Sequence, residues 1–201
     1  MVAINPKISI VIPTSDSEGK KFLPRCLESI EIQTYTNYEV IVTKEGKVAH
    51  NLNCGIKRAT GDIIKVLCDD DYLNGQFALE EIASAWKGGW LVSGCVHDQG
   101  NGQLIGPHCP GWNDHIHRGF NTIGGLSVLA FENKDPLLFG EGLDWVVDID
   151  FYKRAFLRYC LPRFLVTPNV VIGLGPHQLT NSLTQEQRTK EIGLMAQTYG
   201  E

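Results

Sequence analysis

Ile63-Ile64-Lys65-Val66-Leu67-Cys68 runs directly into three carboxylates, Asp69-Asp70-Asp71, and this stretch decides the fold. A short apolar run of this kind is typical of a buried strand, so the carboxylates lie where that strand ends. Ligands of open α/β sheets bind beyond the carboxyl ends of the strands. Three acids at that edge repel one another and favour a divalent cation with oxygen ligands, which can hold a substrate diphosphate. The alternative is an acidic turn that caps a helix starting near Gly75.

Composition limits the classes of function. The chain has 201 residues and a net charge of −5, so it is long enough for one domain with a substantial core. The negative charge argues against nucleic acid as a main ligand. No apolar run is long enough to span a bilayer, and residues 1–6 lack the features of a secretory signal. The six cysteines have no paired spacing and are expected to be reduced thiols, so we expect a cytoplasmic protein.

Strands and helices alternate in the first half of the sequence. Apolar runs predict the strands, and apolar residues at helical spacing predict the helices between them. The expected strands are 8–12, 38–42, 63–67 and 90–96, and the expected helices are 22–30, 48–59 and 77–86. This alternation with short connections predicts an α/β fold, with a mostly parallel, doubly wound sheet flanked by helices.

The second half of the sequence changes character. Residues 97–125 are rich in Gly, His, Pro and Asn, with a turn at 100–102. The elements expected after them are a strand at 126–131, a helix at 144–159, a β-rich segment at 164–172 interrupted by Pro168, and a terminal helix at 186–199. The sequence contains no repeat and no low-complexity linker, so we expect a single domain over residues 1–201.

Several motifs follow one another in a set order. They are Pro13-Thr14 after the first run, Asn53-Cys54-Gly55 and Ala59-Thr60-Gly61-Asp62 before the acidic stretch, Asp148-Ile149-Asp150 in a later helix, and His177 followed by Ser182. In order and spacing these motifs resemble those of the family 2 glycosyltransferases, which have a GT-A (Rossmann-like) fold. The resemblance is dense over residues 8–73 and sparse afterwards. It implies a nucleotide- and metal-binding half at 1–96 and an acceptor and catalytic-base half at 97–201.

The resemblance also implies an activity and its residues. The activity is an inverting transfer of a sugar from a nucleotide-sugar, with a UDP-sugar as first choice, to a hydroxyl of a glycan or another acceptor, with Mn²⁺ or Mg²⁺. The residues implied for nucleotide binding are Pro13, Thr14, Asp16, Glu45, Asn53 and Asp69. Those implied for the metal are Asp70, Asp71 and His177. The implied catalytic base is Asp148, with Asp150 as the second candidate.

The residue types suit this chemistry. A cation held by Asp70, with Asp69 or Asp71, stabilises the negative charge that grows on a leaving diphosphate. The register of the motif stays open, because Asp69 with Asp71 also forms an Asp-x-Asp pattern. A carboxylate is needed to take the proton of the acceptor hydroxyl. Asp150 lies two residues after Asp148 and faces a different side of the helix.

Other polar and aromatic residues have plainer explanations. Arg154 lies four residues after Asp150 and is spaced to pair with it. Asp144 is an acid near the start of the expected helix, where the helix dipole favours it. Trp112, in a Pro-Gly loop, is the expected acceptor contact. Trp86 and Trp90 are expected in the core, as most tryptophans are.

The sequence departs from the family pattern at three positions. Lys44 stands where an Asp is expected, Cys68 replaces an acid at the end of the metal strand, and Val147 replaces a Glu before Asp148. These departures leave open a degenerate protein that binds nucleotide or glycan without turnover. A nucleotidyltransferase is a further alternative, although residues 15–21 lack its Gly-rich basic phosphate loop.

A cluster of cysteines and histidines offers a rival site. Its members are Cys95, His97, His108, Cys109, His115 and His117. These side chains can bind zinc, and a zinc-dependent interaction module is therefore an alternative, but their spacing is not that of a zinc ribbon or finger. The short chain also leaves open whether a partner, such as a second copy in a homo-oligomer, completes the acceptor site.

Overall fold

The computed structural model describes residues 5–15, 19–100 and 102–200. Its strands are β1 (Ile8–Pro13), β2 (Tyr38–Thr43), β3 (Ile63–Val66), β4 (Tyr72–Leu73), β5 (Trp90–Asp98), β6 (Leu104–His108), β7 (Leu129–Glu132) and β8 (Arg163–Gly173). Its helices are α1 (Gly19–Glu31), α2 (Val48–Arg58), α3 (Ala78–Ala85), α4 (Val147–Tyr159), α5 (Leu179–Ser182) and α6 (Gln185–Tyr199), with 3-10 turns η1 (Ile116–Arg118) and η2 (Leu126–Val128).

All of these strands belong to one sheet. Its order is β2-β1-β3-β7-β5-β8-β4, and β6 pairs with β5. Strand β7 is antiparallel to both of its neighbours, β3 and β5. Strands β1, β2, β3, β5 and β8 therefore share one direction, whereas β4, β6 and β7 run the other way. The expected α/β fold with a mostly parallel sheet in one domain is confirmed, with β7 as an antiparallel insertion.

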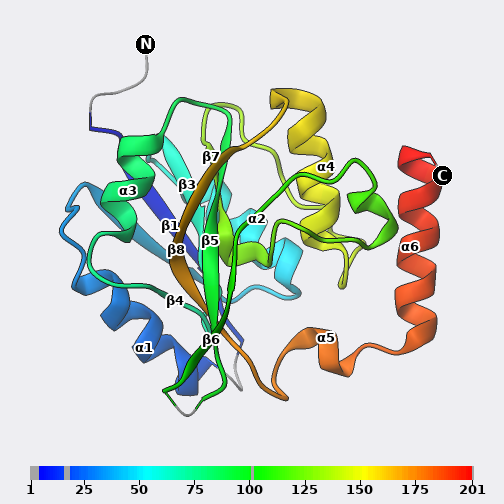
Figure 1. The fold of residues 1–201 in the computed structure, drawn as a ribbon, viewed down its shortest axis with the longest axis horizontal. Coiled ribbons are helices and arrows are strands. Elements are labelled where there is room, and N and C mark those ends of the chain that lie inside the picture. The colour runs from blue at the N-terminus through cyan, green and yellow to red at the C-terminus, as the bar shows by residue number, and fades with distance from the viewer. Residues whose placement is uncertain (1–4, 16–18, 101, 201) are drawn as a thin grey trace.

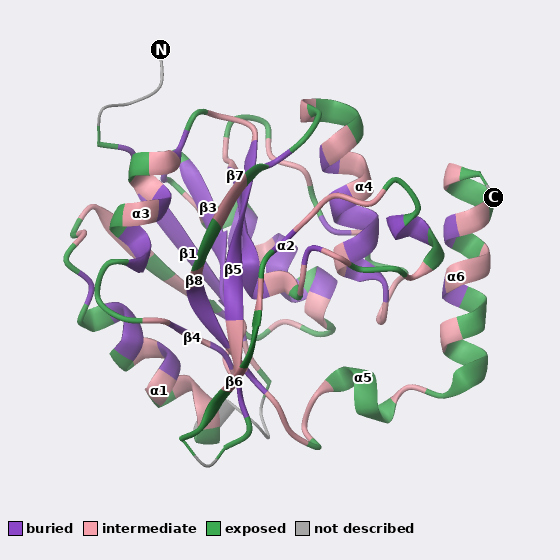
Figure 2. Cartoon of the chain, in the orientation of Figure 1, coloured by how far each residue is buried: buried purple, intermediate pink, exposed green. Residues whose placement is uncertain are grey.

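Helices cover the sheet on both sides. Figure 1 shows α1 and α3 on one side and α4 on the other, with α6 at the outer edge beyond α4. Strands β1 and β3 are buried along their whole length, whereas α6 is largely exposed (Figure 2). Strand β1 is buried at every position instead of alternating, as expected for a strand covered on both faces. Among the described helices, none has the length and apolar content that crossing a membrane requires.

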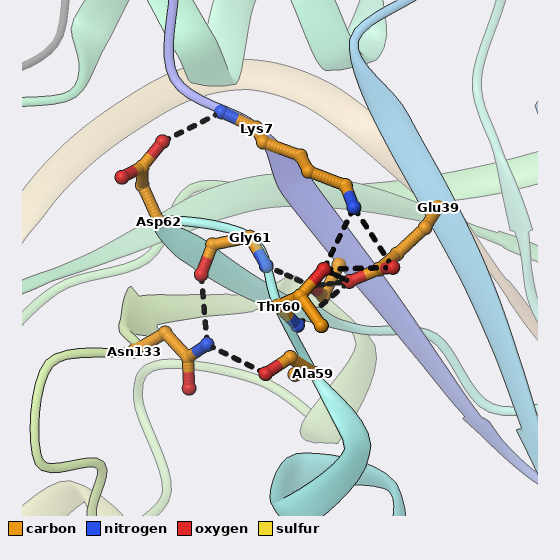
Figure 3. Close-up of polar contacts among 8 residues, drawn as sticks. Lys7, Glu39, Ala59, Thr60, Gly61, Asp62 and Asn133 are labelled. Atoms are coloured by element: carbon orange, nitrogen blue, oxygen red, sulfur yellow. Dashed lines mark hydrogen bonds and ion pairs between the residues drawn. The ribbon is translucent and has the colours of Figure 1, made fainter.

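A polar network ties the strands together at the end of the sheet opposite the acidic stretch. Glu39 on β2 accepts hydrogen bonds from Ser9 Oγ (2.6 Å), the backbone N–H of Thr60 (2.8 Å) and Lys7 Nζ (2.9 Å). Figure 3 shows Lys7, Glu39 and Thr60 converging there. Partial burial raises the pKa of Glu39, but these hydrogen bonds outweigh it and lower the pKa to about 2. The segment 59–62 thus joins β1 and β2 and fixes where β3 begins.

Three local expectations from the sequence are wrong. Residues 126–128 form the 3-10 turn η2, and the strand begins only at Leu129. Helix α4 begins at Val147 and not at residue 144. The acidic stretch caps no helix, because α3 starts at Ala78 and its N-cap, Phe77, receives no side-chain hydrogen bond. The interruption expected at Pro168 is present as a shift of register between β5 and β8.

Close packing of α2 on the sheet yields a first prediction. A Cβ added at Gly55 would lie 2.3 Å from Val11 Cγ1 and 3.3 Å from Thr43 Cγ2. Valine is stiff about χ1, so Gly55→Ala should destabilise the fold by about 1–3 kcal/mol through overpacking. The matched control is Gly193→Ala on α6, where an added Cβ meets nothing within 4 Å. It should stabilise the protein by about 0.5–1 kcal/mol. Urea denaturation that gave both variants equal stability would contradict this packing.

Candidate active site

A cavity of about 360 Å³ opens where β1 and β3 end. Its walls come from segments far apart in the sequence. They are the turn after β1, the start of α2, the acidic stretch after β3, η2, the start of α4, and the segment after β8. The side chains that line the cavity include Thr14, Asn51, Cys68, Asp69, Asp70, Asp71, Trp145, Asp148 and His177.

The three consecutive acids are held by different partners. Asp69 accepts a hydrogen bond from Thr14 Oγ1 (2.6 Å), and Asp70 Oδ2 lies 3.1 Å from His177 Nε2. Asp71 is buried, with 5% exposure, and accepts from the backbone N–H of Gly173 (2.8 Å). Burial, and after it the neighbouring charge of Asp70, raises the pKa of Asp71 to about 8. Burial likewise raises the pKa of Asp70, which His177 opposes.

These side chains have the chemistry of a cation site. The ligand atoms of Cys68, Asp70 and Asp71 all lie within 4.8 Å of one another, and this is the one such group of three found among the described residues. His177, 107 residues from Asp70 in sequence, adds an imidazole nitrogen beside the same carboxylate. The donor set of carboxylates, imidazole and sulfur fits a first-row divalent cation such as Mn²⁺. Asp69 faces Thr14 and lies outside this group.

A buried lysine lies beneath the acids. Lys65 on β3 is fully buried, and its Nζ donates a hydrogen bond to the carbonyl oxygen of Ser127 in η2. Burial lowers the pKa of Lys65 to about 7, although the charge of Asp71 opposes this shift. Ser127 Oγ in turn accepts a hydrogen bond from the backbone N–H of Cys68 (2.8 Å). The sequence pattern gave no sign of this role, because a lysine in an apolar run looks like an exposed position.

The two aspartates of the later helix lie in different surroundings. Asp148 lines the cavity, and its Oδ2 accepts a hydrogen bond from Asn121 Nδ2 (2.8 Å). Removal from water raises the pKa of Asp148 to about 7. Asp150 does not line the cavity; it accepts hydrogen bonds from Arg154 (2.6 Å) and from Tyr199 OH (2.7 Å). The geometry therefore brings Asp148, and not Asp150, to the acidic stretch.

The residues implied for nucleotide binding are only partly brought together. Pro13 and Thr14 line the cavity together with Asp69, whereas Asp16 lies outside the described residues. Neither Glu45 nor Asn53 is part of the cavity wall. Glu45 forms an ion pair with Arg58. The amide group of Asn53 is buried and exchanges hydrogen bonds with the backbone of Phe139.

Asn51 occupies the place expected for Asn53. It lines the cavity, donates from Nδ2 to the carbonyl oxygen of Thr14 (3.0 Å) and accepts at Oδ1 from the backbone N–H of Glu45 (3.0 Å). Asn51 thus links the turn after β1 to the turn after β2. Both asparagines are on α2 and both are buried, but Asn51 is directed toward the cavity and Asn53 toward Phe139.

The aromatic side chain at the cavity is Trp145. It lines the wall beside Asp148, and the guanidinium of Arg188 lies 5.4 Å from its ring centre. Trp112, the expected acceptor contact, is not a wall residue. Its ring stacks on Phe156, with centroids 4.2 Å apart, and its indole N–H donates to Asp114. Trp86 and Trp90 are buried in the core as expected.

Glu191 of α6 explains why α4 begins late. Its buried carboxylate accepts hydrogen bonds from the backbone N–H groups of Asp144 (3.0 Å), Trp145 (2.8 Å) and Val146 (3.1 Å). All three N–H groups precede the helix, so the carboxylate holds residues 144–146 outside it, and a negative charge near this end also suits the helix dipole. The capping group is far away in sequence, so the pattern around residue 144 could not indicate it.

The cysteine- and histidine-rich stretch does not converge on one point in the described residues. His97 Nδ1 lies 3.0 Å from the carbonyl oxygen of Gly106, and His108 Nε2 lies 3.2 Å from that of Thr122. His117 is buried between η1 and α6. The zinc alternative therefore has no clustered ligand set in the described part of the chain.

Comparison with solved structures identifies the fold. S. aureus TarS in complex with UDP-GlcNAc matches with a TM-score of 0.73 and 15% identity over 94% of this chain. Its complex with UDP matches with a TM-score of 0.69 and 16% identity over 94%. The mannosyltransferase PcManGT from Pyrobaculum calidifontis, in complex with GDP-Man and Mn²⁺, matches with a TM-score of 0.63 and 14% identity over 96%.

These similarities establish a GT-A glycosyltransferase fold. The chain spans 65% of the TarS chain bound to UDP-GlcNAc and 64% of the other two chains. No protein-family model and no curated protein matches the sequence. At sequence identities this low, the similarity is one of fold alone.

The raised pKa of Asp148 predicts a pH-dependent stability. Its ordinary pKa is 3.8 and its folded-state pKa is about 7, so the folded protein binds this proton more tightly than the unfolded chain between these values. This contribution to stability is present below pH 4 and is lost as the pH rises to 7. Asp148→Asn cannot ionise, so its free energy of unfolding should rise relative to wild type by about 1–3 kcal/mol between pH 4 and pH 8.

The matched control is Asp135→Asn, at a carboxylate whose side chain is 89% exposed and lies outside the cavity. Its difference from wild type is the reference against which the change in Asp148→Asn is judged. Denaturant titrations at pH 4, 6 and 8 measure both differences. Parallel curves for Asp148→Asn and wild type would show that Asp148 is not held in a desolvated place.

Proposed function

We propose that this protein transfers a sugar from a nucleotide-sugar to an acceptor hydroxyl, with inversion at the anomeric carbon and with a bound divalent cation. The observation that carries the proposal is that one cavity holds both Asp148 and the group of Asp70, Asp71 and His177. Cation ligands and a separate carboxylate with a pKa near neutrality are the two requirements of such a transfer. TarS and PcManGT, which share the fold, are bound to nucleotide-sugars.

Each wall of the cavity has a role in this proposal. Thr14 and Asn51 lie at the turns after β1 and β2 and would hold the nucleoside, with Asp69 fixed beside them by Thr14. Asp70, Asp71 and His177 would hold Mn²⁺ or Mg²⁺. When bound, the cation supplies Lewis-acid stabilisation of the leaving diphosphate. The donor diphosphate therefore belongs at the acidic stretch, next to the end of β3.

The proton of the acceptor hydroxyl goes to Asp148. A general base works best when its pKa lies near the operating pH, and the pKa of Asp148 of about 7 meets that condition. Asn121 fixes one carboxylate oxygen of Asp148, so the orientation of the base is set before substrate arrives. Trp145 lies beside it and offers an aromatic face for a sugar ring. A single displacement by the activated hydroxyl inverts the anomeric centre.

A second candidate is a protein that binds nucleotide or glycan without turnover. The observation that favours it is the loss of acidic groups around the cavity. Cys68 and Val147 line the wall where the family pattern has acids, and the carboxylate of Glu45 is engaged by Arg58. This candidate keeps the nucleotide and cation contacts and removes only the chemical step, so binding and turnover must be measured separately.

Thermal denaturation with nucleotides and Mn²⁺ tests the binding step. UDP at about a hundred times its dissociation constant, with Mn²⁺, should add about 2.7 kcal/mol of stability and raise the melting temperature by about 5–10 °C. The same measurement with GDP and Mn²⁺ shows whether the site prefers uracil or guanine as the nucleobase. Asp70→Ala should remove the shift, because it removes a cation ligand. A full shift in Asp70→Ala, or equal shifts with and without Mn²⁺, would overturn the metal assignment.

Release of UDP from UDP-sugars in the presence of hydroxyl acceptors tests the chemical step. Asp148→Asn should keep the Mn²⁺-dependent shift with UDP and lose at least about a hundredfold in turnover, the range expected for removing a general base. Asp150→Asn, two residues away and outside the cavity, is the matched control and should keep turnover. Binding by wild type with no turnover of any UDP- or GDP-sugar would favour the second candidate.

A further inference from the structure

Cys68 occupies an unusual place for a cysteine. It lies two residues after the end of β3, lines the cavity, and has its sulfur within 4.8 Å of ligand oxygens of both Asp70 and Asp71. The other five cysteines lie elsewhere and line no part of this cavity. Two atoms that bind one ion at about 2.0–2.3 Å lie about 3–4.5 Å apart, so small side-chain shifts bring the sulfur and both carboxylates onto one ion.

We propose that Cys68 Sγ is itself a ligand of the cation, completing a Cys-Asp-Asp-His set with Asp70, Asp71 and His177. The inference rests on the proposed function and specifies its cation. A thiolate is a soft ligand and favours Zn²⁺, Co²⁺ and Mn²⁺ over Mg²⁺, which takes oxygen ligands in near-octahedral geometry. The site therefore selects a borderline first-row cation, with Zn²⁺ or Co²⁺ bound more tightly than Mg²⁺.

The surroundings fix each donor independently of an ion. Ser127 Oγ accepts from the backbone N–H of Cys68, which sets the chain direction at the end of β3. Gly173 N–H engages Asp71 Oδ1, and the side chain of Ser127 also hydrogen-bonds to this carboxylate, so its orientation is set from two sides. His177 has a side-chain exposure of only 12%, and its ring packs on Phe22 with centroids 4.3 Å apart. The imidazole is thus held over Asp70 by contacts unrelated to the acids.

Gly173 shows how closely this set is assembled. A Cβ at Gly173 would lie 2.3 Å from the carbonyl oxygen of Asp70, so strand β8 approaches the acidic stretch as closely as glycine allows. The same carbonyl oxygen accepts a hydrogen bond from Arg25 Nη2 (2.9 Å), so it is turned away from the cavity toward α1. Sulfur, two carboxylates and one imidazole make four donors, the number that a tetrahedral zinc site uses.

The experiment uses Co²⁺ as a spectroscopic probe of the full chain, reduced and freed of metal with a chelator. A thiolate bound to Co²⁺ gives a sulfur-to-cobalt charge-transfer band in the near ultraviolet, which carboxylates and imidazoles do not give. Wild type should develop the band with a one-to-one end point, and Cys68→Ser should lack it. Cys54→Ser is the matched control, because Cys54 also has a histidine nearby, with its Sγ 3.6 Å from His50 Nε2. It should keep the band.

Competition between cations tests the selectivity. Calorimetric titration should show that Cys68→Ser weakens Zn²⁺ binding by about tenfold or more and leaves Mg²⁺ binding within about threefold of wild type. Cys68→Asp, which supplies a hard oxygen ligand, should strengthen Mg²⁺ binding relative to Zn²⁺. Unchanged Zn²⁺ affinity in Cys68→Ser would overturn the proposal.

Alkylation of wild type keeps the test independent of any variant. Iodoacetamide labelling followed by mass spectrometry should show that Zn²⁺ protects Cys68 and leaves the exposed Cys109 and Cys160 unprotected. A Mn²⁺-dependent shift with UDP that is lost in Asp70→Ala, without a charge-transfer band or protection of Cys68, would overturn the cysteine ligand and leave the proposed transferase intact. Absence of binding of any of these cations would overturn both.

Discussion

Negative charge at the end of β3 is the constraint on which the rest of the site depends. Asp69, Asp70 and Asp71 follow one another, and the structure takes the last two largely out of water. Like charges in such a place are costly unless each finds a donor or a cation. The donors come from three distant segments: Thr14 after β1, Gly173 at the end of β8, and His177 beyond it. Hydrogen bonds to the three acids thereby bring these segments together around the cavity.

The opposite wall depends on the last helix. Glu191 on α6 binds the backbone of the segment before α4. This segment carries Trp145 into the cavity and leads into the first turn of α4, where Asp148 lies. Tyr199 at the end of the same helix binds Asp150. A mostly exposed helix thus acts through two polar side chains, Glu191 near its middle and Tyr199 at its end. Its carboxylate holds the backbone of residues 144–146, which leads into α4.

Local patterns in the sequence were enough for much of the fold. Apolar runs and helical spacing located β1, α1, β2, α2, β3 and α3, because these elements bury a face decided by residues close together in the chain. The insertion of β7 between β3 and β5 was not predictable, since strand order depends on pairing over long separations. The turn η2 was mistaken for strand because its residues are apolar, although Ser127 within it serves Cys68 and Lys65.

Some residues of the candidate site were likewise expected from the sequence, whereas others could be recognised only in the folded structure. Asp70, Asp71, Asp148 and His177 were expected from motif positions, and the structure brings them to one cavity. Asn53 and Asp150 were expected on the same grounds, yet one supports the backbone of Phe139 and the other pairs with Arg154. A motif fixes the residue type and its helix, whereas the direction of the side chain depends on rotations of about 100° per residue and on partners elsewhere. Asn51 and Trp145 could be assigned only once those directions were known.

The cost of the buried acids argues for a working site. Burial raises the pKa values of Asp71 and Asp148 to about 8 and about 7, so each destabilises the folded state in its charged form. Hydrophobic residues of similar size would pack in these places without that cost. Such a desolvation cost is expected where folding stability is given up for binding or chemistry. It is concentrated around one cavity and is absent from the polar network at Glu39, whose pKa is lowered. The charged side chains around this cavity are therefore present at a cost in folding stability.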